Sequence, residues 1–410
     1  MGTAQVRKVR DEEFDAWSDA IALGFNNPQG RGDGERRRKW LDLDRCWGAF
    51  ADGKPVGTFI GIPLELTVPG NTTVAVDGIT GVSVGAAHRR QGLLSRMMAG
   101  ELAEAKGRGE SIAVLIAAEW PIYGRFGYGP ATETADWTLD ARCAVFVGDL
   151  PGTVELVDQA TARAEGPVVY DRYRLLTPGN INREPVQWDY ALNLVRRDGK
   201  DPQDELYALC RDEEGTAVGF VRYSFGPEKW TNQRPDMKLR AIDLFATEAR
   251  YEARLWKYLA DHDWVSEVYT EERIGAADPL WRDLLVDRRV AWPKSAWEGM
   301  WLRILDPVAA LSARAYEAAG RIVLRITDKD GYAEGTFALE AGPGGATCAA
   351  STESPDVTVP VDVLGSIYLG GFTADRYRRL GRIEEHTPGA AAVLNALFRT
   401  AAAPVNSTMF

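Results

Sequence analysis

One stretch decides the fold: residues Gly81 to Ala118, which read GVSVGAAHRRQGLLSRMMAGELAEAKGRGESIAVLIAA. The pattern predicts a short strand over Val82–Val84, a tight connection, a long helix and a second strand over Ile112–Ala117. From Leu94 onward, the apolar residues of the helix recur at intervals of three or four. This spacing gives the helix one face that can be buried against a core.

The connection carries the chemistry, because Arg89-Arg90-Gln91-Gly92-Leu93-Leu94 places two guanidinium groups and a glycine where the helix starts. Unpaired backbone N–H groups and the positive end of the helix dipole meet at such a start, so it can hold an anion. Gly92 lets the backbone approach a ligand closely, and the arginines add positive charge around it. The alternative is a solvated basic helix end, which the strand before it and the helix after it make weaker.

The order of strand, R-R-x-G, helix and strand resembles the acetyl-CoA site of the GNAT N-acetyltransferases. The resemblance implies that the pantetheine arm pairs with the backbone of the strand, beside Val82, Ser83 and Val84. It also implies that the pyrophosphate sits on the loop and the helix start. The residues expected to hold the pyrophosphate are Arg89, Arg90, Gln91, Gly92, Leu93, Leu94 and Ser95.

A second informative segment, Glu119 to Gly129, follows the second strand and reads EWPIYGRFGYG. Its two tyrosines are predicted to lie at the mouth of a cleft on flexible, glycine-rich backbone. A tyrosine in that position can donate a proton to a departing thiolate. The alternative is that both rings simply pack in the interior, which is the commoner fate of a tyrosine.

Taken together, the two segments are similar to the Eis-like (enhanced intracellular survival) acetyltransferases, which acetylate amines on aminoglycosides and on lysine side chains. The similarity lies in A-E-x-x-I-Y-G-R-F-G-Y-G, preceded by A-H-R-R-x-G-L-L. It implies that Tyr123, and not Tyr128, is the general acid and that Ala118 and Glu119 contact the cofactor. It further implies that the terminal carboxylate, on Phe410, is the general base.

Composition narrows the class of protein. The chain has 410 residues, 45% hydrophobic and 10% aromatic, enough for two or three domains with packed cores. The net charge of −11 and the pI of about 5.1 argue against nucleic acid as a partner. Four widely spaced cysteines form no C-x-x-C pair, which favours a cytoplasmic protein with reduced thiols. We find no signal peptide, membrane-spanning segment or metal-binding motif in the sequence.

Residues 1–148 are predicted to form a catalytic GNAT domain, and residues 149–294 contain an internal echo of it. A hairpin, a strand, a helix from Arg250 to Asp261 and another strand follow one another in both halves. At the second strand-to-helix turn there is no glycine and no arginine pair, and Glu248 and Glu252 would repel a phosphate. We therefore expect a degenerate GNAT-like domain that does not bind the cofactor.

Residues 295–410 form a third unit, in which a strand, a helix, a hairpin and further helices follow one another. This order, with Tyr368-Leu369-Gly370-Gly371, resembles the sterol-carrier-protein fold that closes Eis-like chains. The expected fold class is therefore α+β: two tandem GNAT-like α/β domains followed by a sterol-carrier-protein-like α+β domain. Residues 401–410 would ordinarily be taken as a frayed tail, but the resemblance places them in the active site.

The expected activity is acetyl-CoA-dependent N-acetylation by direct transfer to a primary amine, with a backbone N–H near Val84 stabilising the oxyanion. An aminoglycoside, a lysine side chain, a polyamine and a small arylamine all stay open as the acceptor. Asn26 and Asn27 stand near the position of an aspartate in an Eis-like substrate pocket, and Met409 stands where a relative has a glutamate. Losing acidic groups there would weaken the hold on a polycation.

Two further expectations follow from the resemblance. Eis-like proteins form hexamers, so the chain is expected to be a homo-oligomer. The rival hypothesis is a lipid- or sterol-binding carrier, in which the third domain holds an apolar ligand and the acyltransferase site is vestigial. The intact R-R-x-G motif, Tyr123 and a terminal Phe410 argue against this rival.

Overall fold

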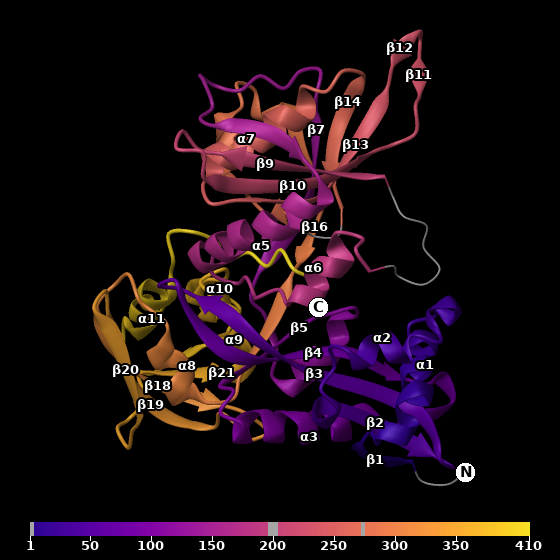
Figure 1. Cartoon of the computed structure of the whole chain (residues 1–410). Coiled ribbons are helices and arrows are strands. Elements are labelled where there is room, and N and C mark those ends of the chain that lie inside the picture. The colour runs from indigo at the N-terminus through magenta and orange to yellow at the C-terminus, as the bar shows by residue number, and fades with distance from the viewer. Residues whose placement is uncertain (1–3, 196–203, 272–274) are drawn as a thin grey trace.

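The computed structural model describes residues 4–195, 204–271 and 275–410, and its strands form three large sheets (Figure 1). Each sheet is the centre of one unit of the molecule. The first and third units share one hydrophobic core, in which Leu64 and Val114 of the first sheet pack with Leu324 of the third. The second unit has its own core, which includes Trp137 and Leu255.

The first sheet holds the stretch that organises the sequence. In spatial order its strands are β1 (Gln5–Lys8), β2 (Cys46–Ala51), β3 (Lys54–Val68), β4 (Thr72–Val84), β5 (Ile112–Ile116), β17 (Met300–Ile304) and β6 (Gly129–Pro130). Helices cover both faces of the sheet. Adjacent residues of β3 point to opposite faces, so they contact different helices. Ile60 packs with α1 (Phe14–Gly24), and Phe59 packs with α3 (Leu93–Gly107). The predicted strand, helix and strand are therefore confirmed.

The second sheet repeats the plan of the first. In spatial order its strands are β15 (Gly275–Ala276), β7 (Glu133–Asp140), β14 (Val265–Thr270), β13 (Met237–Ala246), β10 (Ala217–Phe225), β9 (Glu205–Arg211) and β8 (Thr153–Val157), with β16 (Ala291–Glu298) also paired to β7. Its helices are α5 (Gln159–Leu176), α6 (Pro185–Ala191) and α7 (Ala249–Ala260). A small exposed hairpin, β11 (Trp230–Thr231) with β12 (Arg234–Pro235), extends from it.

The third unit has a five-stranded sheet and four helices. The strands, in spatial order, are β20 (Gly345–Ala350), β19 (Gly335–Gly342), β18 (Gly320–Thr327), β21 (Val357–Pro360) and β22 (Glu384–Glu385). The helices are α8 (Pro307–Ala313), α9 (Val361–Tyr368), α10 (Ala374–Arg379) and α11 (Ala390–Phe398). Helix α8 ends at Ala313, and the next residue, Arg314, is in an extended conformation.

Two strands lie in a different sheet from the one that their place in the sequence suggested. Strand β7 falls within the expected domain 1–148 but pairs with β14 and β16 of the second sheet. Strand β17 falls within the expected domain 295–410 but pairs with β5 of the first sheet, with Leu302 opposite Val114. The sheets therefore exchange strands across residues 148 and 294. Long-range pairing decides which sheet a strand joins, and a local pattern does not encode it.

The end of the chain lies inside the molecule. Figure 1 places the C-terminus at the centre of the view, where the second unit meets the other two. Residues 404–408 are buried, and Phe410 is half-buried. None of the helices in the described ranges is long and apolar enough to cross a membrane.

Candidate active site

A fork between two parallel strands forms the centre of the candidate site. Strands β4 and β5 pair over Val76–Ile79 and then separate, while β4 continues to Val84 alongside β3. Within the described residues, this last part of β4 has no strand partner on its β5 side. Its backbone groups there can pair with an extended ligand, as an exposed strand edge does with a peptide.

A β-bulge at Gly81 accompanies the separation of the strands. Gly81 and Val82 together lie opposite the single residue Phe59, between the regular pairs on either side. Gly81 has a φ of +60°, and a Cβ at this position would lie 2.6 Å from Cδ1 of Ile60. A glycine in the left-handed region is a standard first residue of a bulge. Gly81 is therefore required by the backbone, and the bulge re-aims the end of β4.

The loop after β4 brings two arginines to the start of α3. Arg89 is exposed, and its Nε donates to the carbonyl oxygen of Val84 at 3.5 Å. Arg90 and Gly92 both have positive φ values, of 63° and 72°. Gly92 is the residue at the helix N-terminus, where no side chain caps the backbone. The N–H groups of this first turn can therefore bind an anion.

The other residues expected at the pyrophosphate lie on the same loop and first turn, but they differ in exposure. Gln91 and Ser95 are exposed, Leu94 is half-buried and Leu93 is buried. The side chain of Leu93 belongs to the core under the sheet, so only its backbone is placed to meet a ligand. Ala118 and Glu119 are exposed just after β5.

Tyr123 lies at the end of α4 (Trp120–Tyr123), the short helix that follows β5, and is 8% exposed. Burial raises its pKa, and the nearby Glu119 carboxylate raises it further. Its ring packs edge-on against Tyr128, with centroids 6.3 Å apart. Tyr128 is fully buried, and its hydroxyl lies 3.9 Å from Sδ of Met98. Of the two phenols, Tyr123 is therefore the one nearer to solvent.

The structure brings several of the expected residues together on one side of the first sheet. Tyr123 and Leu93 belong to the same hydrophobic cluster, and Val82 and Val84 pack against it. A cavity of about 370 Å³ lies at the end of β4, on its α1 side. It is lined by Ser83, Val84 and Arg89 together with the end of α1 and Asn26. The end of β4 and the loop before α3 therefore border one cavity, and Tyr123 lies in the cluster on the α3 side of the same sheet.

The C-terminal tail is held by residues of the segment between α5 and α6. The N–H of Val405 donates to the carbonyl oxygen of Pro178 at 2.9 Å. The N–H and the hydroxyl of Ser407 both donate to Oδ1 of Asn180, at 3.0 and 2.8 Å. Asn180 is fully buried, and its own carbonyl oxygen accepts from the N–H of Thr67 in β3. The same residue therefore joins the first sheet to the tail.

Arg183 provides a second anchor for the tail. Its Nε donates to the hydroxyl of Thr408 at 2.8 Å, and its Nη2 donates to the carbonyl oxygen of Ser407 at 3.1 Å. Its guanidinium also forms an ion pair with Asp243, in which Nη1 and Oδ2 are 2.5 Å apart. Asp243 is buried in β13, next to a β-bulge at Ile242 that corresponds in place to the bulge of β4.

Phe410 is brought to the opposite face of the first sheet from Tyr123. It lines a cavity of about 490 Å³ together with Ile62 of β3, which packs on the cluster of α1. Ile62 pairs with Gly78, which lies within the part of β4 that still pairs with β5. The tail therefore approaches the fork from the α1 side and Tyr123 approaches it from the α3 side.

The matching helix start in the second unit offers less to an anion. Glu248 stands at the N-terminus of α7, where its carboxylate pairs with Arg250 at 2.7 Å. Burial raises the pKa of Glu252 to about 7, so at neutral pH much of the repulsion expected from this residue is absent. Glu248 and the lack of a glycine still distinguish this turn from the one that precedes α3.

The described part of the chain contains no group of three His, Cys, Asp or Glu residues placed to hold a metal ion.

Comparison with known proteins agrees with this architecture. Residues 5–131 and 179–304 each match an acetyltransferase (GNAT) domain, and residues 307–407 match a sterol carrier protein domain. A Streptomyces avermitilis protein described as an uncharacterized N-acetyltransferase is 38% identical over 99% of this chain and 98% of its own length. The N-acetyltransferase Eis of Mycobacterium tuberculosis is 34% identical over 86% of this chain and 85% of its own length.

The chain belongs to the Eis family of GNAT N-acetyltransferases. A crystal structure of Eis1 from Mycobacterium abscessus is similar over 99% of this chain and 100% of its own, with a TM-score of 0.85 and 28% identity. The expected fold class, two GNAT-like domains followed by a sterol-carrier-like domain, is confirmed. The family, and with it N-acetyltransferase activity, is confirmed as well.

Sequence reasoning missed the residues that anchor the tail in this Eis-family chain. Asn180 and Arg183 were not singled out, because their partners Ser407 and Thr408 lie more than 220 positions away. No local periodicity marks either residue. The bulge at Gly81 was also missed, although a glycine within a strand pattern is a recognised signal for one.

We predict that Asn180→Ala releases the tail. The variant loses both hydrogen bonds to Ser407, which costs about 1–3 kcal/mol and makes opening of the tail roughly tenfold or more frequent. Digestion with carboxypeptidase, followed by mass spectrometry, should therefore trim the variant much faster than the wild type. Asn395→Ala is the matched control, because Asn395 also accepts a backbone N–H, from Asp375, but in the third unit. Equal trimming rates for wild type and Asn180→Ala would show that Asn180 does not hold the tail.

Proposed function

We propose that the chain takes acetyl-CoA as its acetyl donor and transfers the acetyl group directly to a primary amine. The observation that carries this proposal is the fork beyond Ile79, with its bulge, next to an uncapped helix start and two arginines. The free edge of β4 suits the amide groups of a pantetheine arm. The helix start with Arg89 and Arg90 suits a pyrophosphate.

The other residues proposed to bind the cofactor are assigned their roles from their positions around the fork. Val82, Ser83 and Val84 would flank the arm, and Ala118 and Glu119 would meet it at the end of β5. The loop and first turn from Arg89 to Ser95 would surround the pyrophosphate, with Leu93 contributing its backbone. In the reaction, the amine nitrogen forms a bond to the acyl carbon and the carbon–sulfur bond breaks. A backbone N–H near Val84 would stabilise the oxyanion between the two events.

Tyr123 is assigned the role of general acid, which gives its proton to the departing thiolate. It is nearly buried beside the helix start, and its raised pKa keeps the phenol protonated through neutral pH. Tyr128 is a poor alternative, because it is fully enclosed and its hydroxyl faces the thioether of Met98.

Phe410 is assigned the role of general base, through its α-carboxylate, which accepts the proton of the attacking amine. Four residues of the tail are tied down just before it, from Val405 to Thr408. A base must be held within hydrogen-bond reach of the proton that it takes. The anchors at Asn180 and Arg183 therefore support this role.

Aminoglycosides and lysine side chains, the amines implied by the resemblance to the Eis-like family, are the reference acceptors for the proposal. By the same resemblance we propose that the chain forms a homo-oligomer, a hexamer, which light scattering on the purified protein would test.

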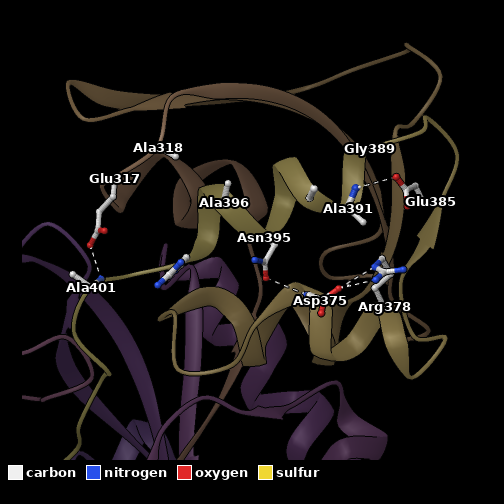
Figure 2. Close-up of a pocket in the computed structure, with 12 residues that line it drawn as sticks. Glu317, Ala318, Asp375, Arg378, Glu385, Gly389, Ala391, Asn395, Ala396 and Ala401 are labelled. Atoms are coloured by element: carbon white, nitrogen blue, oxygen red, sulfur yellow. Dashed lines mark hydrogen bonds and ion pairs between the residues drawn. The ribbon is translucent and has the colours of Figure 1, made fainter.

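The rival function, a lipid or sterol carrier, gains little from the third unit. A groove of this unit has a volume of about 800 Å³ and lies along α10 and α11 (Figure 2). Charged side chains are part of its lining, including Glu317, Asp375, Arg378, Glu385 and Arg399. Two of them, Asp375 and Arg378, form an ion pair with each other on α10. A sterol needs an apolar cavity that buries most of its surface, and this groove does not provide one.

Arg90→Ala should raise the KM for acetyl-CoA roughly tenfold or more, which corresponds to about 1.4 kcal/mol, because one of two charges near the pyrophosphate is lost. The fold should survive, since Arg90 is exposed. Arg379→Ala, an exposed arginine on α10, serves as the control and should leave the KM unchanged. Calorimetric titration with acetyl-CoA measures the effect directly. Unchanged affinity in a folded Arg90→Ala protein would contradict the pyrophosphate assignment.

Tyr123→Phe should lower kcat roughly 10²-fold or more with little change in acetyl-CoA affinity, because the proton is given only in the transition state. Tyr128→Phe removes the hydroxyl of the neighbouring, more deeply buried tyrosine and should cost far less. The pKa of Tyr123 is raised above the usual tyrosine value of about 10. Deprotonation of Tyr123 should therefore cause no loss of wild-type kcat below a pH of about 10. Steady-state kinetics across pH test both points, and a larger loss at Tyr128 would reverse the assignment.

A single glycine added after Phe410 should abolish most turnover, because it displaces the carboxylate from its position. Phe410→Leu keeps the carboxylate in place and should cost less. Both proteins are compared with the wild type by kcat and by acetyl-CoA affinity, and the affinity should change in neither. A wild-type kcat in the extended protein would remove the carboxylate from the mechanism.

A further inference from the structure

The cavity that contains Phe410 is lined by aromatic and aliphatic side chains. Trp40, Tyr190 and Phe410 supply three rings, and Ile62 and Ile242 supply branched aliphatic surface. These residues come from five different parts of the chain: the segment after α2 (Gly34–Arg38), β3, α6, β13 and the tail. An aromatic body of ordinary size fits a cavity of about 490 Å³ with such a lining.

The charged residues of the same cavity are mostly basic. The arginines that line it are Arg36, Arg37, Arg183 and Arg222, against two aspartates and the carboxylate of Phe410. Both aspartates are already engaged, Asp33 with Arg36 and Asp243 with Arg183. Neither carboxylate is therefore free to receive an additional cation from a substrate.

The positive charge of Arg37 has no carboxylate in the cavity that pairs with it alone. Its Nη1 donates to the carbonyl oxygen and the hydroxyl of Ser18, at 2.8 and 3.1 Å, and these are neutral partners. Asp33 lies 3.7 Å from its Nε, but that carboxylate is shared with Arg36. Burial lowers the pKa of Arg37 and the charge of Arg36 lowers it further, and these effects exceed the opposite effect of the Asp19 carboxylate. A second cation near these two arginines would be repelled.

The cavity also contains hydrogen-bond donors that lack an acceptor. Nε1 of Trp40 and Nε of Arg222 are buried, and neither has a hydrogen-bond partner among the described residues. Neither nitrogen is accessible to solvent, so a ligand oxygen can accept from one of them only after its side chain turns toward the cavity. Carboxylate oxygens are acceptors only, and Arg pairs with them strongly.

This cavity adjoins the one beside the fork. Asn26 lines the cavity that contains Ser83 and Val84, and its neighbour Asn27 lines the cavity that contains Phe410. One short segment therefore borders both spaces. An amine group at one end of an acceptor can approach the fork while the rest of the molecule occupies the cavity with the rings.

We propose that the acceptor is a primary monoamine that carries an aromatic ring and, at the far end, a carboxylate, and that polycations are poor substrates. The ring packs with Trp40, Tyr190 and Phe410, the carboxylate meets Arg37, and the amine reaches the fork. This proposal rests on the acetyltransferase function proposed above and names its substrate class. It departs from the aminoglycosides, which carry several positive charges.

A panel of acceptors tests the proposal on the wild-type protein at saturating acetyl-CoA, with release of free thiol as the readout. The panel contains 4-(2-aminoethyl)benzoate, phenethylamine, spermidine and kanamycin. We expect kcat/KM to be highest for 4-(2-aminoethyl)benzoate, at least tenfold above both polycations. A higher value for either polycation would overturn the proposal, and equal values for the two aromatic amines would overturn the carboxylate assignment. No thiol release with any amine would instead count against the acetyltransferase function itself.

Variants of two neighbouring arginines locate the effect. Arg37→Gln should lower the ratio of kcat/KM between 4-(2-aminoethyl)benzoate and phenethylamine about tenfold, and Arg37→Lys should restore most of the ratio. Arg38→Gln is the matched control on the same helix, because Arg38 pairs with Asp11 and stacks on Phe14 away from the cavity. A ratio that falls equally in Arg38→Gln, or that stays unchanged in a folded Arg37→Gln protein, would show that Arg37 does not bind the carboxylate.

Discussion

The ion pair between Arg183 and Asp243 is the contact on which the arrangement of the site depends. Both side chains are buried, and a buried charge that loses its partner costs about 3–5 kcal/mol. The pair is therefore held together firmly, and the remaining donors of Arg183 are directed at Ser407 and Thr408. Tyr170 adds to the same network, because its ring lies under the guanidinium and its hydroxyl bonds to Thr408. The buried carboxylate of Asp243 in the second unit therefore determines, through Arg183, where the tail lies against the first unit.

This network gives the degenerate repeat a use. Strand β13 has a bulge at Ile242, as β4 has one at Gly81, so the two repeats keep the same backbone device. In β4 the bulge borders an open strand edge. In β13 it borders Asp243, whose carboxylate is occupied by Arg183. In the second repeat the bulge thus lies beside the ion pair that orients the tail.

The sequence was sufficient for the family, the order of elements and most residues around the fork. Those features are local: an R-R-x-G at a helix start, a glycine-rich turn after a strand and a repeated hairpin can each be recognised within a few residues. The assignment of β7 and β17 to sheets could not be obtained in this way, because Leu302 meets Val114 across almost two hundred positions. The anchors Asn180 and Arg183 are of the same kind. Their residue types are common, and only the folded chain shows what they hold.

Strand β17 has a consequence for how the molecule is made. It lies between β5 and β6 in the first sheet, so an interior strand of the N-terminal unit is supplied from beyond residue 299. A growing chain on the ribosome therefore cannot complete its first sheet until about three quarters of it has been synthesised, although domains generally fold in order from the N-terminus. Until then the edge of β5 lacks its neighbour and is open to wrong pairing. Ser407 and Thr408 follow later still, so that a chain terminated before them carries the helix start and Tyr123 but lacks the contacts of the tail with Asn180 and Arg183.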